Sequence, residues 1–149
     1  MDINNLYRRI IMEHYKDPKN KGLVEDASYL LINMTNPSCG DNVVLQLKVE
    51  DEIIKDIRHE GVGCSICCSA ASMISEILKG KTKKEALEIL DEYHLMIKGE
   101  SYNKEILNND LIVYEGVAKF PARIRCATLA SRALEEGLLK KEDKHEWKF

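Results

Sequence analysis

The sequence has no long apolar run and no excess of basic residues. No stretch approaches the roughly 18 to 20 apolar residues of a membrane span, and the first fifteen residues mix charged with apolar side chains, unlike a secretory signal. Because 22 Lys and Arg stand against 25 Asp and Glu, the formal net charge of -3 argues against nucleic-acid binding. Internal repeats and low-complexity segments are absent as well. We therefore expect a cytoplasmic protein that binds neither nucleic acid nor membranes.

The composition is that of a globular protein, with 44% hydrophobic and 32% charged residues. A chain of 149 residues can bury about two thirds of its unfolded surface in one core, so we expect a single domain over residues 1–149. Five cysteines without a secretory signal indicate a reducing compartment. There, thiols serve as metal ligands, nucleophiles or small core residues more often than as disulfides.

The hydrophobic period is helical at residues 1–15, changes to two over residues 28–60, and returns to 3.6 afterwards. It predicts strands over residues 28–34, 43–50 and 53–60, with Ile53 and Ile57 on one face of the third strand. Helices are predicted over residues 66–78, 82–97, 111–117 and 121–138, the second of them starting with a capping box at Thr82 and Glu85. This order predicts an α+β fold with a three-stranded antiparallel sheet and helices packed on one face.

The last predicted helix has a narrow apolar face, and Gly137 with the charged residues from 140 onward is interpreted as an exit to solvent.

Three cysteines and an aspartate stand at predicted element junctions. Cys39 and Asp41 share the turn at residues 36–41, while Cys64 and Cys126 fall near helix starts, a setting that favours thiolate. Three thiolates and one carboxylate suit the tetrahedral preference of zinc. Each cysteine taken alone is about as well explained as a small buried hydrophobe.

The remaining cysteines and the histidines carry less information. Cys67 is expected in the core, and Cys68 either fills space or approaches the site. No histidine has ligand spacing to the cysteines.

Three motifs in this order resemble the U-type (IscU/NifU-like) iron–sulfur cluster assembly proteins. They are Asn-Pro-Ser-Cys-Gly-Asp at 36–41, Gly-Cys-Ser at 63–65, and Lys-Phe-Pro-Ala-Arg-Ile-Arg-Cys-Ala at 119–127. The long segment between Cys64 and Cys126 resembles the SufU-type members of Gram-positive bacteria. Scaffold members carry a histidine before the third cysteine, where this chain has Arg125.

The resemblance implies a SufE/NifU-like fold and a zinc-dependent sulfurtransferase. Such a protein accepts persulfide sulfur from a PLP-dependent cysteine desulfurase of the SufS type and passes it to downstream Suf cluster assembly proteins. Cys39 is then the catalytic sulfur acceptor, and Arg123 lies beside the site. Matched residue by residue, the ligands of Zn2+ are Cys39, Asp41, Cys64 and Cys126.

Two other functions fit the same residues. The first is a scaffold that assembles a transient [2Fe-2S] cluster and transfers it. The second is a structural zinc module that serves only for interaction. Iron reconstitution and labelling of a Cys39 persulfide would separate these functions from sulfur transfer.

Overall fold

The computed structural model describes residues 3–37 and 40–139. Cys39, the predicted sulfur acceptor, therefore lies outside the described residues, as does Ser38. The elements in chain order are α1 (Ile3–Lys16), β1 (Leu30–Asn36), β2 (Asp41–Glu50), β3 (Ile53–Val62), α2 (Ser65–Leu78), α3 (Lys83–Ile97), the 3-10 helix η1 (Asp110–Lys119) and α4 (Pro121–Leu139).

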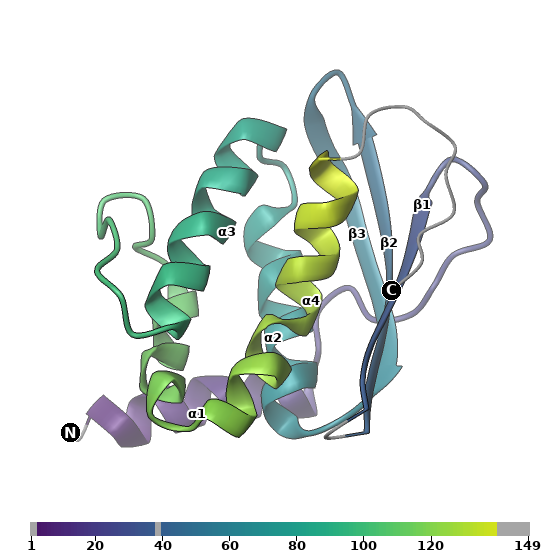
Figure 1. The fold of residues 1–149 in the computed structure, drawn as a ribbon. Coiled ribbons are helices and arrows are strands. Elements are labelled where there is room, and N and C mark those ends of the chain that lie inside the picture. The colour runs from purple at the N-terminus through teal and green to yellow at the C-terminus, as the bar shows by residue number, and fades with distance from the viewer. Residues whose placement is uncertain (1–2, 38–39, 140–149) are drawn as a thin grey trace.

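The strands form one antiparallel sheet in the order β1-β2-β3, and the helices lie on one side of it (Figure 1). This confirms the predicted α+β fold. Asp51 and Glu52 turn the chain between β2 and β3, both with positive φ. That conformation is typical of tight hairpin turns, which match the right-handed twist of the strands.

A bulge shifts the register between β2 and β3. Lys48 pairs with Asp56 and Val49 pairs with Ile54, so one residue of β3 is left over. The predicted pairing of Ile53 and Ile57 on one face is therefore wrong for Ile53 alone, because the bulge turns Ile54 into the core instead. Ile54 and Ile57 are both almost completely buried, while Ile53 is only half-buried.

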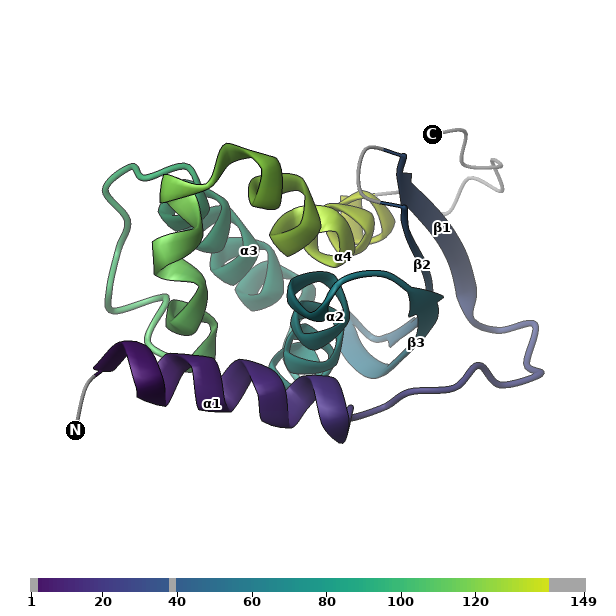
Figure 2. The ribbon, with the colours of Figure 1, turned by 90° about the horizontal axis from the view of Figure 1, so that it is seen from below.

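Helix α2 lies at the centre of the helical layer. Figure 2 shows it end-on between α1 and α4, and its buried residues occupy most of its circumference. Helix α3 begins at the predicted capping box, in which Thr82 and Glu85 satisfy each other's backbone N–H groups. Among residues 3–37 and 40–139, no helix is long and apolar enough to cross a membrane.

Helix α4 differs from its prediction. It has no narrow apolar face, because it packs against the sheet, α2 and α3 and buries ten residues. Gly137 does not lead to solvent but lies inside the helix, where a Cβ atom would stand 2.5 Å from Ile32 Cδ1. Glycine is needed there because helix and sheet approach closely.

Three short hydrogen bonds join polar side chains of the helical layer, all of them buried except the partly buried His94, and we call them the helix ties. His14 Nδ1 lies 2.7 Å from Ser72 Oγ, which joins α1 to α2. Ser69 Oγ lies 2.6 Å from Tyr114 Oη, which joins α2 to η1. His94 Nε2 lies 2.8 Å from Ser131 Oγ, which joins α3 to α4.

Candidate metal centre

Asp41 is the first residue of β2 and pairs across the sheet with Asn36, the last residue of β1. Its side chain is buried, with only 2% of the residue exposed. Oδ1 accepts a hydrogen bond from the backbone N–H of Cys64 at 3.0 Å, and Oδ2 lies 3.5 Å from the Asn36 Nδ2 donor. Both donors are neutral, and a buried carboxylate is costly unless a cation balances its charge. A divalent metal ion would supply that charge.

Cys64 is the N-cap residue of α2, at the predicted junction between strand and helix. An N-cap is commonly Ser, Thr, Asp or Asn, whose side chain bonds the first helical N–H groups. Cys64 makes no such side-chain bond. Its sulfur is thus left for another role, while its N–H orients Asp41.

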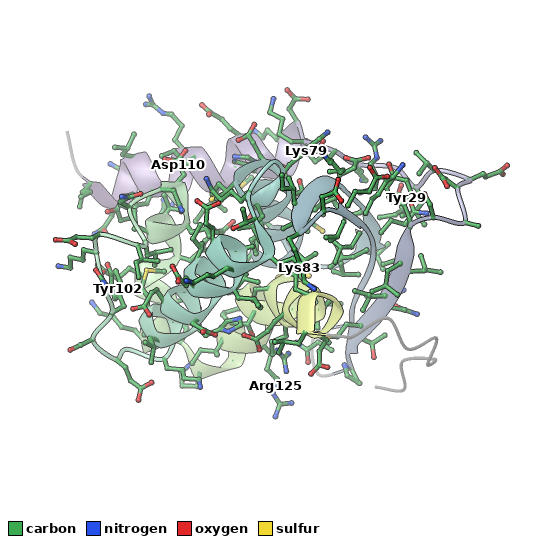
Figure 3. The ribbon with its side chains drawn as sticks, turned by 90° about the horizontal axis from the view of Figure 1, so that it is seen from above. Tyr29, Lys79, Lys83, Tyr102, Asp110 and Arg125 are labelled. Carbon is green, nitrogen blue, oxygen red and sulfur yellow. The ribbon has the colours of Figure 1, made fainter. Side chains whose placement is uncertain are left out.

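Cys126 lies in the second turn of α4 and is 1% exposed. Its neighbour Arg125 is exposed and points away from the protein (Figure 3). Guanidinium groups have no lone pair to donate to a metal, so this position supplies no ligand. Arg123 is exposed in the first turn of the same helix.

The fold brings these three side chains to one point. A carboxylate oxygen of Asp41 and the sulfurs of Cys64 and Cys126 all lie within 4.8 Å of one another. Ligand atoms of tetrahedral zinc lie about 3.5 to 3.8 Å apart, so the donor set and its spacing suit such an ion. The assignment of Cys39, Asp41, Cys64 and Cys126 as ligands stays a prediction, since Cys39 is outside the described residues.

Gly63 makes room for the carboxylate. A Cβ atom at this position would stand 2.5 Å from Asp41 Oδ1 and would push it aside. In the sequence, Gly63 and Asn36 stand only as parts of the quoted motifs, with no predicted role of their own. In the structure, Asn36 Nδ2 lies 3.9 Å from Cys126 Sγ as well as near Asp41. Their positions in the same motifs as the predicted ligands could have indicated a role at the site.

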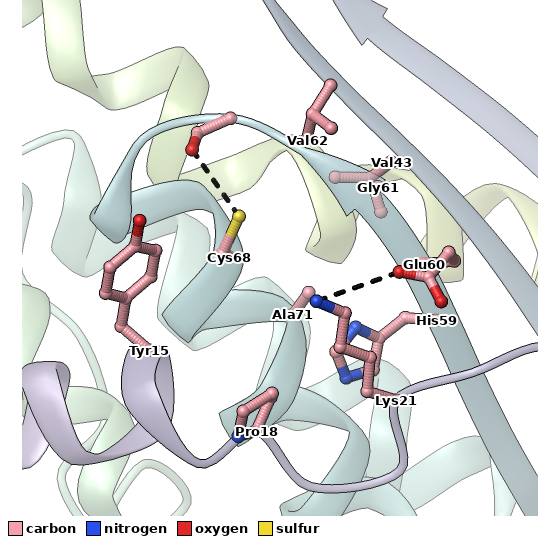
Figure 4. A pocket seen from close by; sticks show the side chains of 11 residues that line it. Tyr15, Pro18, Lys21, Val43, His59, Glu60, Gly61, Val62, Cys68 and Ala71 are labelled. Carbon is pink, nitrogen blue, oxygen red and sulfur yellow. Dashed lines mark hydrogen bonds and ion pairs between the residues drawn. The ribbon is translucent and has the colours of Figure 1, made fainter.

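The two other cysteines lie on α2. Cys67 is completely buried, which confirms its predicted place in the core. Cys68 lines a cavity of about 260 Å3 together with Tyr15 and Lys21, and its Sγ lies 3.6 Å from the Gly63 carbonyl (Figure 4). Burial raises the pKa of the Cys68 thiol, with a further contribution from Cys64. A thiol that stays protonated is a poor nucleophile, which counts against Cys68 as a sulfur acceptor.

The three histidines within the described residues have structural partners. His14 and His94 belong to the helix ties, and His59 Nε2 lies 2.7 Å from the Lys19 carbonyl. Backbone hydrogen bonds of His59 hold the segment after α1 against β3. Burial lowers the pKa of the His59 ring.

Most of the chain matches one known family of proteins. The NifU-like N-terminal domain family matches residues 6–146, and the chain belongs to this family.

Two relatives cover most of the chain. The zinc-dependent sulfurtransferase SufU of Bacillus subtilis is 43% identical over 141 residues, which is 95% of each protein. The iron-sulfur cluster assembly scaffold protein IscU of Streptococcus pyogenes is 37% identical over 138 residues, which is 91% of this chain and 84% of the relative. The family thus includes both a sulfurtransferase and a scaffold, and membership alone does not choose between them.

Solved structures share the fold. A candidate scaffold protein for the SUF system from Fervidobacterium islandicum AW-1 superposes with a TM-score of 0.83 at 31% identity, covering 92% of this chain and 99% of that one. A NifU-like protein from Brucella abortus has a TM-score of 0.79, covering 90% of this chain and 92% of that one; at 21% identity it shows the fold alone.

Proposed function

We propose that this protein is a zinc-dependent sulfurtransferase that accepts persulfide sulfur from a PLP-dependent cysteine desulfurase for iron-sulfur cluster biogenesis. The observation that carries this proposal is the convergence of Asp41, Cys64 and Cys126 within 4.8 Å, with Asp41 only two residues after Cys39 in the sequence. Their ligand types suit zinc, and a SufU relative at 43% identity is named as zinc-dependent. Arg125 stands next to Cys126, at the position where scaffold members carry a histidine. Because its guanidinium group cannot bind a metal, this position favours sulfur transfer over a scaffold role.

Each residue has a defined task in this function. Asp41, Cys64 and Cys126 hold the ion together with Cys39, and zinc when bound keeps the Cys39 thiol deprotonated without any redox chemistry. The Cys39 thiolate attacks the outer sulfur of the desulfurase persulfide. A new S–S bond forms on Cys39, the old one breaks, and the desulfurase cysteine leaves as a thiolate. No oxidant is required, because one persulfide replaces another.

The proposed partners are those that the resemblance to SufU-type proteins implies. The donor is a SufS-type cysteine desulfurase, and the acceptors of the sulfur are downstream Suf cluster assembly proteins. Residues 1–149 act as one unit, in which Arg123 beside the site orients or shields it. Thiol sites of this kind require a reducing compartment, so we place the protein in the cytoplasm.

The acceptor is tested with the purified protein, its metal content and a SufS-type desulfurase supplied with cysteine. Cys39→Ser should reduce the reaction to the rate of the desulfurase alone, whereas the matched variant Cys68→Ser should still stimulate it. Mass spectrometry of alkylated peptides should find the added sulfur on the peptide that contains Cys39. If Cys39→Ser stimulates the desulfurase as strongly as the wild type does, the proposal is wrong.

A scaffold for a [2Fe-2S] cluster is the second candidate, favoured by the identity to IscU of Streptococcus pyogenes. Anaerobic incubation with iron and sulfide separates the two functions. A stable visible chromophore with stoichiometric iron supports the scaffold, and zinc that resists displacement by iron supports sulfur transfer. If zinc is retained but no sulfur ever reaches Cys39, the site is a structural zinc module.

A further inference from the structure

The side chain of Asn36 bridges two of the predicted ligands. Asn36 ends β1 and is 3% exposed. Its Nδ2 lies 3.5 Å from Asp41 Oδ2 and 3.9 Å from Cys126 Sγ. Asp41 comes from the sheet and Cys126 from α4, so one amide group touches ligands from two separate elements.

The other end of the same amide has an unusual environment. Among the described residues, Asn36 Oδ1 is buried and accepts no hydrogen bond. A buried oxygen of this kind lowers stability, and a leucine of nearly the same shape would avoid the loss. Packing alone therefore does not explain an asparagine at this position. The asparagine is explained instead by its side-chain N–H groups, which face the Asp41 carboxylate and the Cys126 thiol.

We propose that Asn36 is a positioning residue of the metal site. The proposal rests on the function proposed above and extends it to a residue outside the ligand set. Donors from a neighbouring side chain orient metal ligands and reduce the electron density on a thiolate sulfur. Asn36 thus holds Asp41 and Cys126 in place and makes the Cys126 thiolate less nucleophilic, which leaves Cys39 as the reactive thiol.

The test compares Asn36→Leu with Asn33→Leu. Asn33 lies on the same strand but on its exposed face, so the control carries the same substitution away from the site. Zinc affinity is measured by competition with a chromophoric chelator, and metal-free stability by urea unfolding. Asn36→Leu should weaken zinc binding about 10- to 100-fold, while its metal-free form unfolds at the same or a higher urea concentration. Asn33→Leu should leave zinc affinity unchanged.

The cobalt(II) forms give a second measurement that a purely structural role would not change. Loss of the N–H donor raises the electron density on Cys126 sulfur, so the thiolate-to-cobalt charge-transfer band of Asn36→Leu should shift to longer wavelength. The band of Asn33→Leu should match that of the wild type.

Asp41→Ala is measured alongside to keep two failures apart. If Asp41→Ala binds zinc as tightly as the wild type, the predicted metal site and the proposed function are both wrong. If Asp41→Ala loses zinc but Asn36→Leu keeps wild-type affinity and spectrum, only the role of Asn36 falls. That role also falls if Asn36→Leu destabilises the metal-free protein as much as it weakens zinc binding.

Discussion

Several of the buried polar side chains lie in two regions of the described structure, the candidate metal centre at the start of β2 and the helix ties among the helices. In the ties, each polar group meets a partner at 2.6 to 2.8 Å. In the candidate metal centre, the Asn36 amide lies 3.5 Å from a carboxylate oxygen of Asp41 and 3.9 Å from the Cys126 sulfur, and Asn36 Oδ1 accepts no hydrogen bond among the described residues. The ties are made within the protein, while the candidate metal centre brings a carboxylate and two thiols together within 4.8 Å, where a cation could bind.

The difference teaches how to separate stability from function in this fold. Fully bonded buried groups join elements, and their removal costs folding free energy. Metal-binding side chains that converge from separate segments indicate a bound ion, whose binding then contributes to folding. Substitutions in the ties should therefore change the stability of the metal-free protein without changing metal affinity. Substitutions around the candidate metal centre should change metal affinity with little change in metal-free stability.

The largest effect is expected in the tie between α3 and α4. Burial lowers the pKa of His94 to about 4, so the folded protein keeps this ring neutral while the unfolded chain takes up a proton below about pH 6.5. Stability should fall as the pH drops from 6.5 to 4, by up to about 3 kcal/mol from this residue. His94→Gln removes that dependence.

Urea unfolding between pH 7 and pH 4 measures this effect. The difference in unfolding free energy between the wild type and His94→Gln should move in favour of the variant as the pH falls. Parallel curves would show that His94 is not held neutral by burial.

An intermediate effect is expected in the tie between α2 and η1. Tyr114→Phe removes the hydroxyl that bonds Ser69, and stability should fall by about 2 kcal/mol because both groups are buried. Tyr102→Phe is the matched control, since the Tyr102 hydroxyl bonds an exposed glutamate, Glu115. That variant should lose less than about 0.5 kcal/mol. Thermal unfolding measures the stability of both variants, and zinc titration measures their zinc affinity. A change in zinc affinity for Tyr114→Phe would contradict the separation between the ties and the candidate metal centre.

The smallest effect should appear in metal binding alone. Gly63→Ala places a methyl group against Asp41 Oδ1, and the carboxylate can move aside because it ends a side chain. We expect zinc affinity to fall about tenfold, or about 1.4 kcal/mol, with little change in metal-free stability. Chelator competition and urea unfolding of the metal-free protein measure the two quantities. Gly116→Ala, where a Cβ meets nothing within 4 Å, is the control. Equal zinc affinity in both variants would show that the room beside Asp41 is not needed.

Local patterns predicted most of the elements. The capping box at Thr82 starts α3, Pro121 starts α4, and the alternation of β2 gives the middle strand. Each of these signals acts within a few residues and needs no information from the rest of the chain. The errors came from contacts between elements. The bulge beside Lys48 moved Ile54 into the core, and packing against the sheet, α2 and α3 buried far more of α4 than a narrow apolar face.

The sequence by itself determined the residue types of the metal centre, their places at element junctions and the α+β order of strands and helices. Only the tertiary structure decided that Asp41, Cys64 and Cys126 meet within 4.8 Å, that Asn36 bridges two of them, and that Gly63 leaves room for the carboxylate. The reason is physical. Periodicity and capping are local, whereas these contacts depend on the strand register at Asn36 and Asp41 and on the packing of α4 against the sheet.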